Sequence, residues 1–184
     1  MQRFKKNNFP FLKGNVLIAA LILSLAANGQ DKKNKNYEWG SLGMGFGLDE
    51  LGSDVTTRSF GVAYNRTIGS KGLFVQGNIQ GTIYNDLPSL FALNFAPGYA
   101  KGLGKNNLMA LSIGGGYMSG DAVNGKSYRA FGINSTLQLH YRPLGDLGLG
   151  VELYANYPLL ATIGNAPASN GLRVVICFSS KPKP

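Results

Sequence analysis

The 184-residue sequence has one cysteine, Cys177, one histidine, His140, and few charged residues. A single cysteine cannot form a disulfide within the chain, and we expect Cys177 to be a small packed residue. One cysteine and one histidine also give no ligand spacing for a zinc, haem or iron-sulfur site, so we expect no metal and no cofactor. Only 15% of the residues are charged, whereas ordinary soluble domains have about 25%. The low charge indicates a surface that is not entirely in water, or a chain rich in turns.

The first 29 residues have the pattern of a secretory signal peptide. An apolar run covers 16–27, and the small residues at 27–29 precede Gln30. The basic start consists of Arg3, Lys5, Lys6 and Lys13. The apolar run is shorter than the ~20 residues that a membrane-spanning helix needs. We therefore expect residues 1–29 to be removed after export.

Removal of 1–29 lowers the formal net charge from +9 to +5, because four basic residues leave with it. The lysines and arginines that remain are scattered, and they form no stripe interleaved with aromatic residues. We therefore expect no nucleic-acid partner. Residues 30–36, QDKKNKN, are expected to be a polar lead-in, and residues 179–184, SSKPKP, a polar tail.

The segment 128–141, YRAFGINSTLQLHY, alternates between two kinds of side chain. Small and polar residues lie between the members of an apolar row, which are Phe131, Ile133, Leu137, Leu139 and Tyr141. Because successive side chains of a strand point to opposite sides, this pattern predicts a strand with one apolar face. Extended at ~3.3 Å per residue, the segment would rise roughly 46 Å, which is enough to cross a bilayer core at a tilt.

The same pattern recurs along the chain, and no helix of useful length is indicated. The strands are expected at 37–48, 59–68, 73–83, 90–99, 108–118, 128–141, 148–157 and 171–178. Pro97 is expected to mark a bulge or the end of its strand, and Asp49–Arg58 and Pro158–Asn170 are expected to be loops. Eight two-faced strands with short connections predict an all-β fold, an antiparallel up-and-down barrel that closes to remove its edges.

Such a barrel can face either way. A soluble barrel would turn its apolar row inward, and a transmembrane barrel would turn it outward to lipid. The non-apolar row carries few charges, which favours the transmembrane barrel with a polar interior. The interior is expected to hold a polar network of Gln76, Asn78, Gln80, Asn94, Asn134, Gln138, His140, Glu152 and Arg173. Glu152 and Arg173 are expected to pair, because an unpaired buried charge is costly.

Over 37–178 the chain resembles the small eight-stranded outer-membrane barrels of Gram-negative bacteria, the OmpA/OmpX-like family. The resemblance rests on the alternation, the connection lengths and the signal peptide. It implies a location in outer-membrane lipid, insertion by the barrel-assembly machinery, and both ends of the barrel in the periplasm. Members of this family usually end on an aromatic strand residue that the machinery reads. The matching segment here is 173–178, RVVICF, and six residues follow it.

The leading functional hypothesis is a non-enzymatic outer-membrane protein that acts as a structural or interaction platform, with protein partners at the external loops. An eight-stranded barrel is narrow enough to be filled by side chains, so no open channel is expected. A second hypothesis is a lipid-modifying enzyme with His140 as its histidine, although no serine lies in a G-x-S-x-G motif. A secreted soluble lipocalin-like binding barrel is a third hypothesis, and a subunit of a secretion or conjugation machinery is a fourth. No catalytic residue is assigned.

Overall fold

The structure, a computed structural model, describes residues 40–51, 55–68, 72–82, 89–103, 107–122, 124–144 and 147–180. The expected signal peptide at 1–29, the lead-in at 30–36 and the end of the tail at 181–184 lie outside these residues. The strands are β1 Gly40–Leu51, β2 Val55–Thr67, β3 Leu73–Thr82, β4 Phe91–Gly102, β5 Asn107–Asp121, β6 Ser127–Leu144, β7 Leu147–Ile163 and β8 Ser169–Ser180. The described residues contain no helix long and apolar enough to span a membrane.

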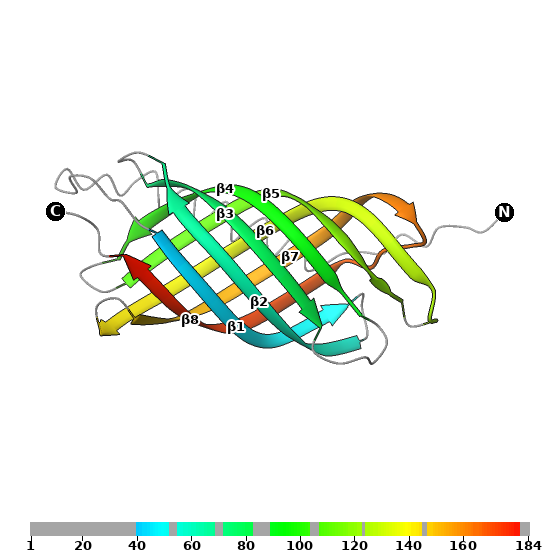
Figure 1. Cartoon of the computed structure of the whole chain (residues 1–184), viewed down its shortest axis with the longest axis horizontal. Coiled ribbons are helices and arrows are strands. Elements are labelled where there is room, and N and C mark those ends of the chain that lie inside the picture. The colour runs from blue at the N-terminus through cyan, green and yellow to red at the C-terminus, as the bar shows by residue number, and fades with distance from the viewer. Residues whose placement is uncertain are drawn as a thin grey trace. The chain divides into compact units, whose positions relative to one another are not determined.

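The eight strands form one closed antiparallel barrel (Figure 1), as the alternation predicted. Each strand pairs with the next one along the chain, and β8 pairs with β1 to close the sheet. The register at the closing seam places Leu42 opposite Phe178 and Leu48 opposite Leu172. Since partners in register point to the same side of the sheet, the apolar rows of neighbouring strands join into one continuous face.

The apolar face points outward, and the small and polar face points into the barrel. Leu149, Val151 and Leu153 are exposed along β7, whereas Gln76, Asn78 and Gln80 are buried along β3. A soluble barrel would have the opposite arrangement, with the apolar row collected in its centre. The fold is therefore that of a transmembrane barrel with lipid-facing apolar side chains.

Both segments that were expected to be long loops are largely strand, so this prediction was wrong. β1 continues to Leu51 and β2 begins at Val55, because the alternation continues through Asp49, which is buried, and Glu50, which is exposed. β7 continues to Ile163 by pairing with β6 after two β-bulges, which leave Leu159 and Thr162 without a partner in register. The connections at this end of the barrel are therefore 52–54, 83–90, 122–126 and 164–168.

Pro97 neither ends β4 nor forms a bulge, which corrects the sequence-based expectation. β4 runs on to Gly102, and Pro97 lies opposite Val75 of β3. The ladder between β4 and β5 lacks pairs at Ala96 and Pro97, and it resumes at Gly98 in the same register. Proline has no N–H group, so a strand can pass through it when only one of the two flanking ladders is interrupted.

Candidate functional site: the polar interior

The interior is organised around the guanidinium group of Arg173, which is 1% exposed. Its Nη1 donates a 3.1 Å hydrogen bond to Oε1 of Glu152, so the ion pair expected between these residues is present. The two residues are partners in register on β7 and β8. Nη2 donates a 2.7 Å hydrogen bond to Oε1 of Gln80 on β3. β1 and β2 lie between β8 and β3 in the sheet, so Arg173 connects two strands that are not neighbours.

Further side chains complete the surroundings of this ion pair. Gln138 on β6 donates from Nε2 to Oε2 of Glu152 at 2.8 Å, so both carboxylate oxygens of Glu152 are bonded. The Tyr154 ring lies beside the guanidinium, with 3.7 Å between Cζ of Arg173 and the ring centroid. The Tyr154 hydroxyl is in turn 3.1 Å from the hydroxyl of Ser59 on β2. A buried ion pair is tolerated when its geometry is good and further hydrogen bonds reach it, as they do here.

A glycine provides the space that Arg173 occupies. A Cβ atom on Gly61 of β2 would overlap Nη1 of Arg173. Gly171, two residues before Arg173, similarly faces the Tyr154 hydroxyl and Oδ1 of Asp49. Asp49 itself is buried near Arg173 and Ser59, and neither of its carboxylate oxygens has hydrogen-bond geometry to a described donor. The centre of the barrel therefore holds two carboxylates and one guanidinium in a space that bare backbone leaves open.

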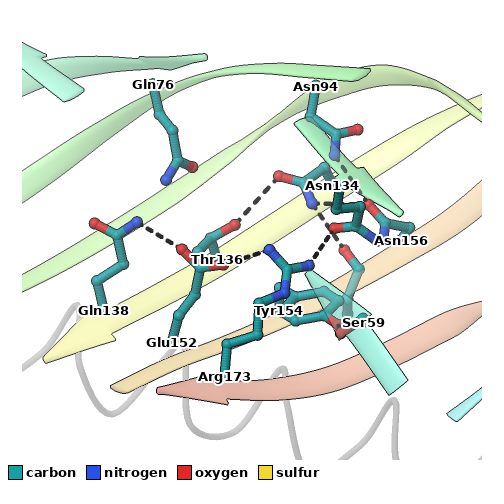
Figure 2. A network of polar contacts seen from close by, with 12 residues as sticks. Ser59, Gln76, Asn94, Asn134, Thr136, Gln138, Glu152, Tyr154, Asn156 and Arg173 are labelled. Carbon is teal, nitrogen blue, oxygen red and sulfur yellow. Dashed lines mark hydrogen bonds and ion pairs between the residues drawn. The ribbon is translucent and has the colours of Figure 1, made fainter. Parts of the chain in front are cut away.

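A second polar cluster is centred on Asn156 of β7. Asn134 and Asn94 both donate from Nδ2 to Oδ1 of Asn156, at 2.8 Å and 3.3 Å. Nδ2 of Asn156 donates to Oγ of Ser169 at 2.9 Å. The Thr136 hydroxyl donates a 3.3 Å hydrogen bond to Oδ1 of Asn134 on the same strand (Figure 2). The cluster joins four strands, because its members come from β4, β6, β7 and β8.

The remaining expected network residues are buried but lie outside these two clusters. Gln76 accepts a 2.6 Å hydrogen bond from the hydroxyl of Ser112 on β5. Asn78 is buried, and neither its Nδ2 nor its Oδ1 has a hydrogen-bond partner among the described residues. His140 is buried against Gly150 of β7, and the hydrogen bonds of the two clusters do not include it. All nine residues therefore face the interior, and six of them belong to the two clusters.

Apolar side chains occupy the interior at both ends of this polar layer. At the end where β1 stops and β6 begins, a cluster contains Leu51, Leu90, Ala92, Met118, Tyr128 and Ala130. At the opposite end, where β3 and β5 begin, a second cluster contains Phe74, Ala100, Leu108 and Ala110. Apolar clusters thus lie toward both ends of the interior, and polar side chains accompany them, since Leu108 and Ala110 pair in register with His140 and Gln138.

Several members of the clusters were not among the nine expected residues. Ser59, Tyr154, Asn156 and Ser169 each bond to a cluster member, and Asp49 lies beside them. The alternation already placed Tyr154 and Asn156 on the inward row of β7, so this signal could have included them. Asp49 and Ser169 fell within the expected loops, where no inward phase was assigned.

The contacts of the central cluster join carboxylate, amide, guanidinium and hydroxyl groups. The serine of the central cluster, Ser59, is bonded to Tyr154, and no imidazole takes part in that contact. Where the chain is described, no three histidine, cysteine or acidic side chains come together in a way that could hold a metal ion. The hydrogen bonds of both clusters connect strands that are not neighbours in the sheet, such as β3 with β8 and β4 with β7.

Comparison with known structures identifies the same barrel in several outer-membrane proteins. Neisserial surface protein A matches with a TM-score of 0.58 and 11% identity, over 77% of this chain and 96% of its own. Ail of Yersinia pestis matches with a TM-score of 0.55 and 9% identity, over 79% and 99%. The N-terminal β-barrel domain of Pseudomonas aeruginosa OprF matches with a TM-score of 0.54 and 14% identity, over 77% and 100%. No protein-family model and no curated protein sequence matches the chain.

Proposed function

Because the chain has the fold of the small eight-stranded outer-membrane barrels, we propose that it is a non-enzymatic outer-membrane protein that serves as a structural or interaction platform. Its outward surface supports this location. Apolar residues cover the outside of the strands, and exposed aromatic residues lie toward both ends of the barrel. Tyr64, Tyr99, Tyr141 and Phe178 lie toward the end where β8 stops, and Phe91 and Phe131 toward the opposite end. Such a band with aromatic girdles matches the hydrocarbon layer and its two interfaces.

The hydrogen bond from Arg173 to Gln80 is the observation that carries the proposal of a filled lumen. It joins β8 to β3 across the barrel at the level of the Glu152 ion pair. The apolar clusters then occupy the interior on both sides of this layer. A barrel of eight strands has little width beyond what side chains fill. We therefore propose that the protein acts through the outer surface of a rigid barrel, and that solutes do not pass through its interior.

The surface best suited to a partner is the end of β7, which we call the β7 rim and define as residues 157–163. β8 begins opposite Asn156, so the β7 rim pairs with β6 but has no β8 partner in register. Leu159, Leu160 and Ile163 of the rim are 70%, 63% and 47% exposed. An unpaired strand edge with apolar side chains can accept an extended segment of another protein. The connections at this end would be external if both barrel ends lie in the periplasm.

Insertion by the barrel-assembly machinery is part of the same proposal. The last described strand carries the alternating outward row Leu172, Val174, Ile176 and Phe178. The row ends on the aromatic Phe178, two residues before the end of β8, and an aromatic residue near the end of the last strand supports this part of the proposal. β8 then closes the barrel by pairing with β1 over their whole length.

Fractionation and gel mobility test the proposal directly. The mature protein should be found with outer membranes, require detergent for extraction, and run at different positions on a gel before and after boiling. A soluble binding barrel would remain in solution without detergent, and this result would reject the proposal. For the platform role, the protein folded in lipid should retain a partner from an outer-membrane extract, and Leu160→Lys should reduce this retention without changing the heat-modifiable band.

A further inference from the structure

The charged residues are distributed unequally between the two ends of the barrel. The end where β1 begins and β8 stops, here called the terminal end, also contains the connections β2–β3, β4–β5 and β6–β7. Among the residues whose side chains the structure describes, the charged residues of the terminal end are Arg66 and Lys101, and both are basic. The opposite end has Arg58, Lys126 and Arg129 together with the acidic Glu50 and Asp121. In the described part of the barrel, the terminal end therefore carries positive charge alone, whereas the opposite end carries both signs.

Two of these basic residues continue the lipid-facing rows of their strands. Arg66 is exposed and follows the exposed Tyr64 on β2, with the inward Asn65 between them. Lys101, which is half-buried, follows the exposed Tyr99 on β4, with the buried Ala100 between them. Both side chains therefore project from the side wall, one outward position beyond a tyrosine of the aromatic girdle. Headgroups begin at this depth in a bilayer, where long basic side chains can reach phosphate groups.

No described acidic side chain compensates these two cations. Among described residues, Asp49, Glu50 and Asp121 lie toward the opposite end and Glu152 lies in the interior. The one ion pair found where the chain is described joins Arg173 to Glu152. Arg66 lies on β2 and Lys101 on β4, and both strands pair with β3, so one strand separates the two basic residues. The result is a positive strip on the side wall with no counter-charge among the described residues.

From this arrangement we infer that the terminal end of the barrel binds anionic phospholipid headgroups through Arg66 and Lys101. The inference rests on the proposed location, in which the terminal end faces the phospholipid leaflet. A lipid is favoured over a soluble acidic polymer because both residues lie on the lipid-facing wall beside the girdle, and not on the surface that crosses the barrel mouth. Arginine offers paired N–H donors to a phosphodiester, and lysine adds a point charge. Each basic residue near an anionic surface contributes about a fivefold preference.

The fluorescence of Trp39, the only tryptophan of the sequence, can be used to measure which lipid lies beside the barrel. It immediately precedes Gly40, which is the register partner of Arg66 on β1. The barrel would be folded into phosphatidylcholine vesicles that contain phosphatidylglycerol, with bromine atoms on the acyl chains of either one lipid or the other. Quenching of Trp39 by brominated phosphatidylglycerol should exceed that by brominated phosphatidylcholine at equal mole fraction. The selectivity should be about fivefold or more and should fall in high salt, because exposed charges are screened.

The decisive comparison uses two matched double variants. Arg66→Gln with Lys101→Gln should bring the selectivity close to one, whereas Arg58→Gln with Arg129→Gln, at the opposite end, should leave it unchanged. Equal quenching by both lipids in the unchanged protein, or an equal loss in both variants, would overturn the inference. So would binding of purified peptidoglycan by the detergent-folded barrel that depends on Arg66 and Lys101 while lipid selectivity is absent. Failure to give a heat-modifiable band in vesicles would instead reject the proposed outer-membrane function.

Discussion

Arg173 on β8 and Gln80 on β3 are 93 residues apart in the sequence, and a 2.7 Å hydrogen bond joins them through the centre of the barrel. The same guanidinium group forms the ion pair with Glu152, so one side chain connects β3, β7 and β8. Neighbouring strands are already joined by the backbone hydrogen bonds of the sheet. A contact between strands that are not neighbours adds resistance to deformation of the whole ring. The interior polar groups are therefore expected to determine stability more than the outward row does.

Removal of the carboxylate of Glu152 should destabilise the folded barrel strongly. Glu152→Ala leaves the buried Arg173 without its partner, and breaking a buried pair from one side costs about 3–5 kcal/mol. Urea titration of the protein in vesicles, followed by the heat-modifiable band, measures this loss. Glu50→Ala on the exposed face of β1 is the matched control and should change the free energy of unfolding by less than about 1 kcal/mol. Equal effects of the two substitutions would show that the ion pair contributes nothing.

A second prediction concerns the space beside the guanidinium. Gly61→Ala would place a methyl group where Nη1 of Arg173 lies, so the ion pair has to shift or break. We expect a loss of about 1–3 kcal/mol in the same titration, which is typical of overpacking. Gly77→Ala is the control, because nothing lies within 4 Å of a Cβ atom at that position. The prediction fails if Gly61→Ala is tolerated as well as Gly77→Ala.

The sequence was sufficient to predict the faces of the strands, but not all of their lengths. The alternation placed Glu152 and Arg173 on the inward rows of adjacent strands, from which their pairing could be inferred. Two bulges in β7 break the two-residue period at Leu159 and Thr162, which made this part of the strand look like a loop. The bond from Arg173 to Gln80 depends on how the strands are staggered around the ring. That stagger is set when the sheet closes, so the alternation of residues within a single strand cannot predict it.

The proposal of a filled interior leads to a prediction about ion flow. In planar lipid bilayers, the protein should show no steady conductance of the size expected for a porin. Polar side chains around Arg173 and apolar side chains of the clusters that contain Leu51 and Phe74 are buried inside the barrel, and they oppose a continuous water-filled path. A porin of about sixteen strands, which leaves an aqueous channel, is the positive control in the same bilayers. A stable, ohmic conductance would contradict the proposal of a closed lumen.

Charge placed at different depths on the outward face of β7 tests the orientation of the barrel in lipid. Leu153 is 43% exposed and lies in the middle of the strand, opposite Leu172 of β8 and Leu137 of β6. Leu160 is exposed on the same strand, but it belongs to the β7 rim, beyond the last residue that pairs with β8. A lysine on the lipid face costs about 2–4 kcal/mol near the bilayer midplane and about 0–1 kcal/mol near an interface.

Leu153→Lys should therefore lower the free energy of unfolding in vesicles by about 2–4 kcal/mol, and Leu160→Lys by no more than about 1 kcal/mol. The same two variants in detergent micelles should differ less, because a micelle adapts its shape to a charged side chain. If both substitutions were harmless in vesicles, the outward row would not face acyl chains at all. A larger cost at Leu160 than at Leu153 would instead place the β7 rim within the hydrocarbon layer, where it could not meet an external partner.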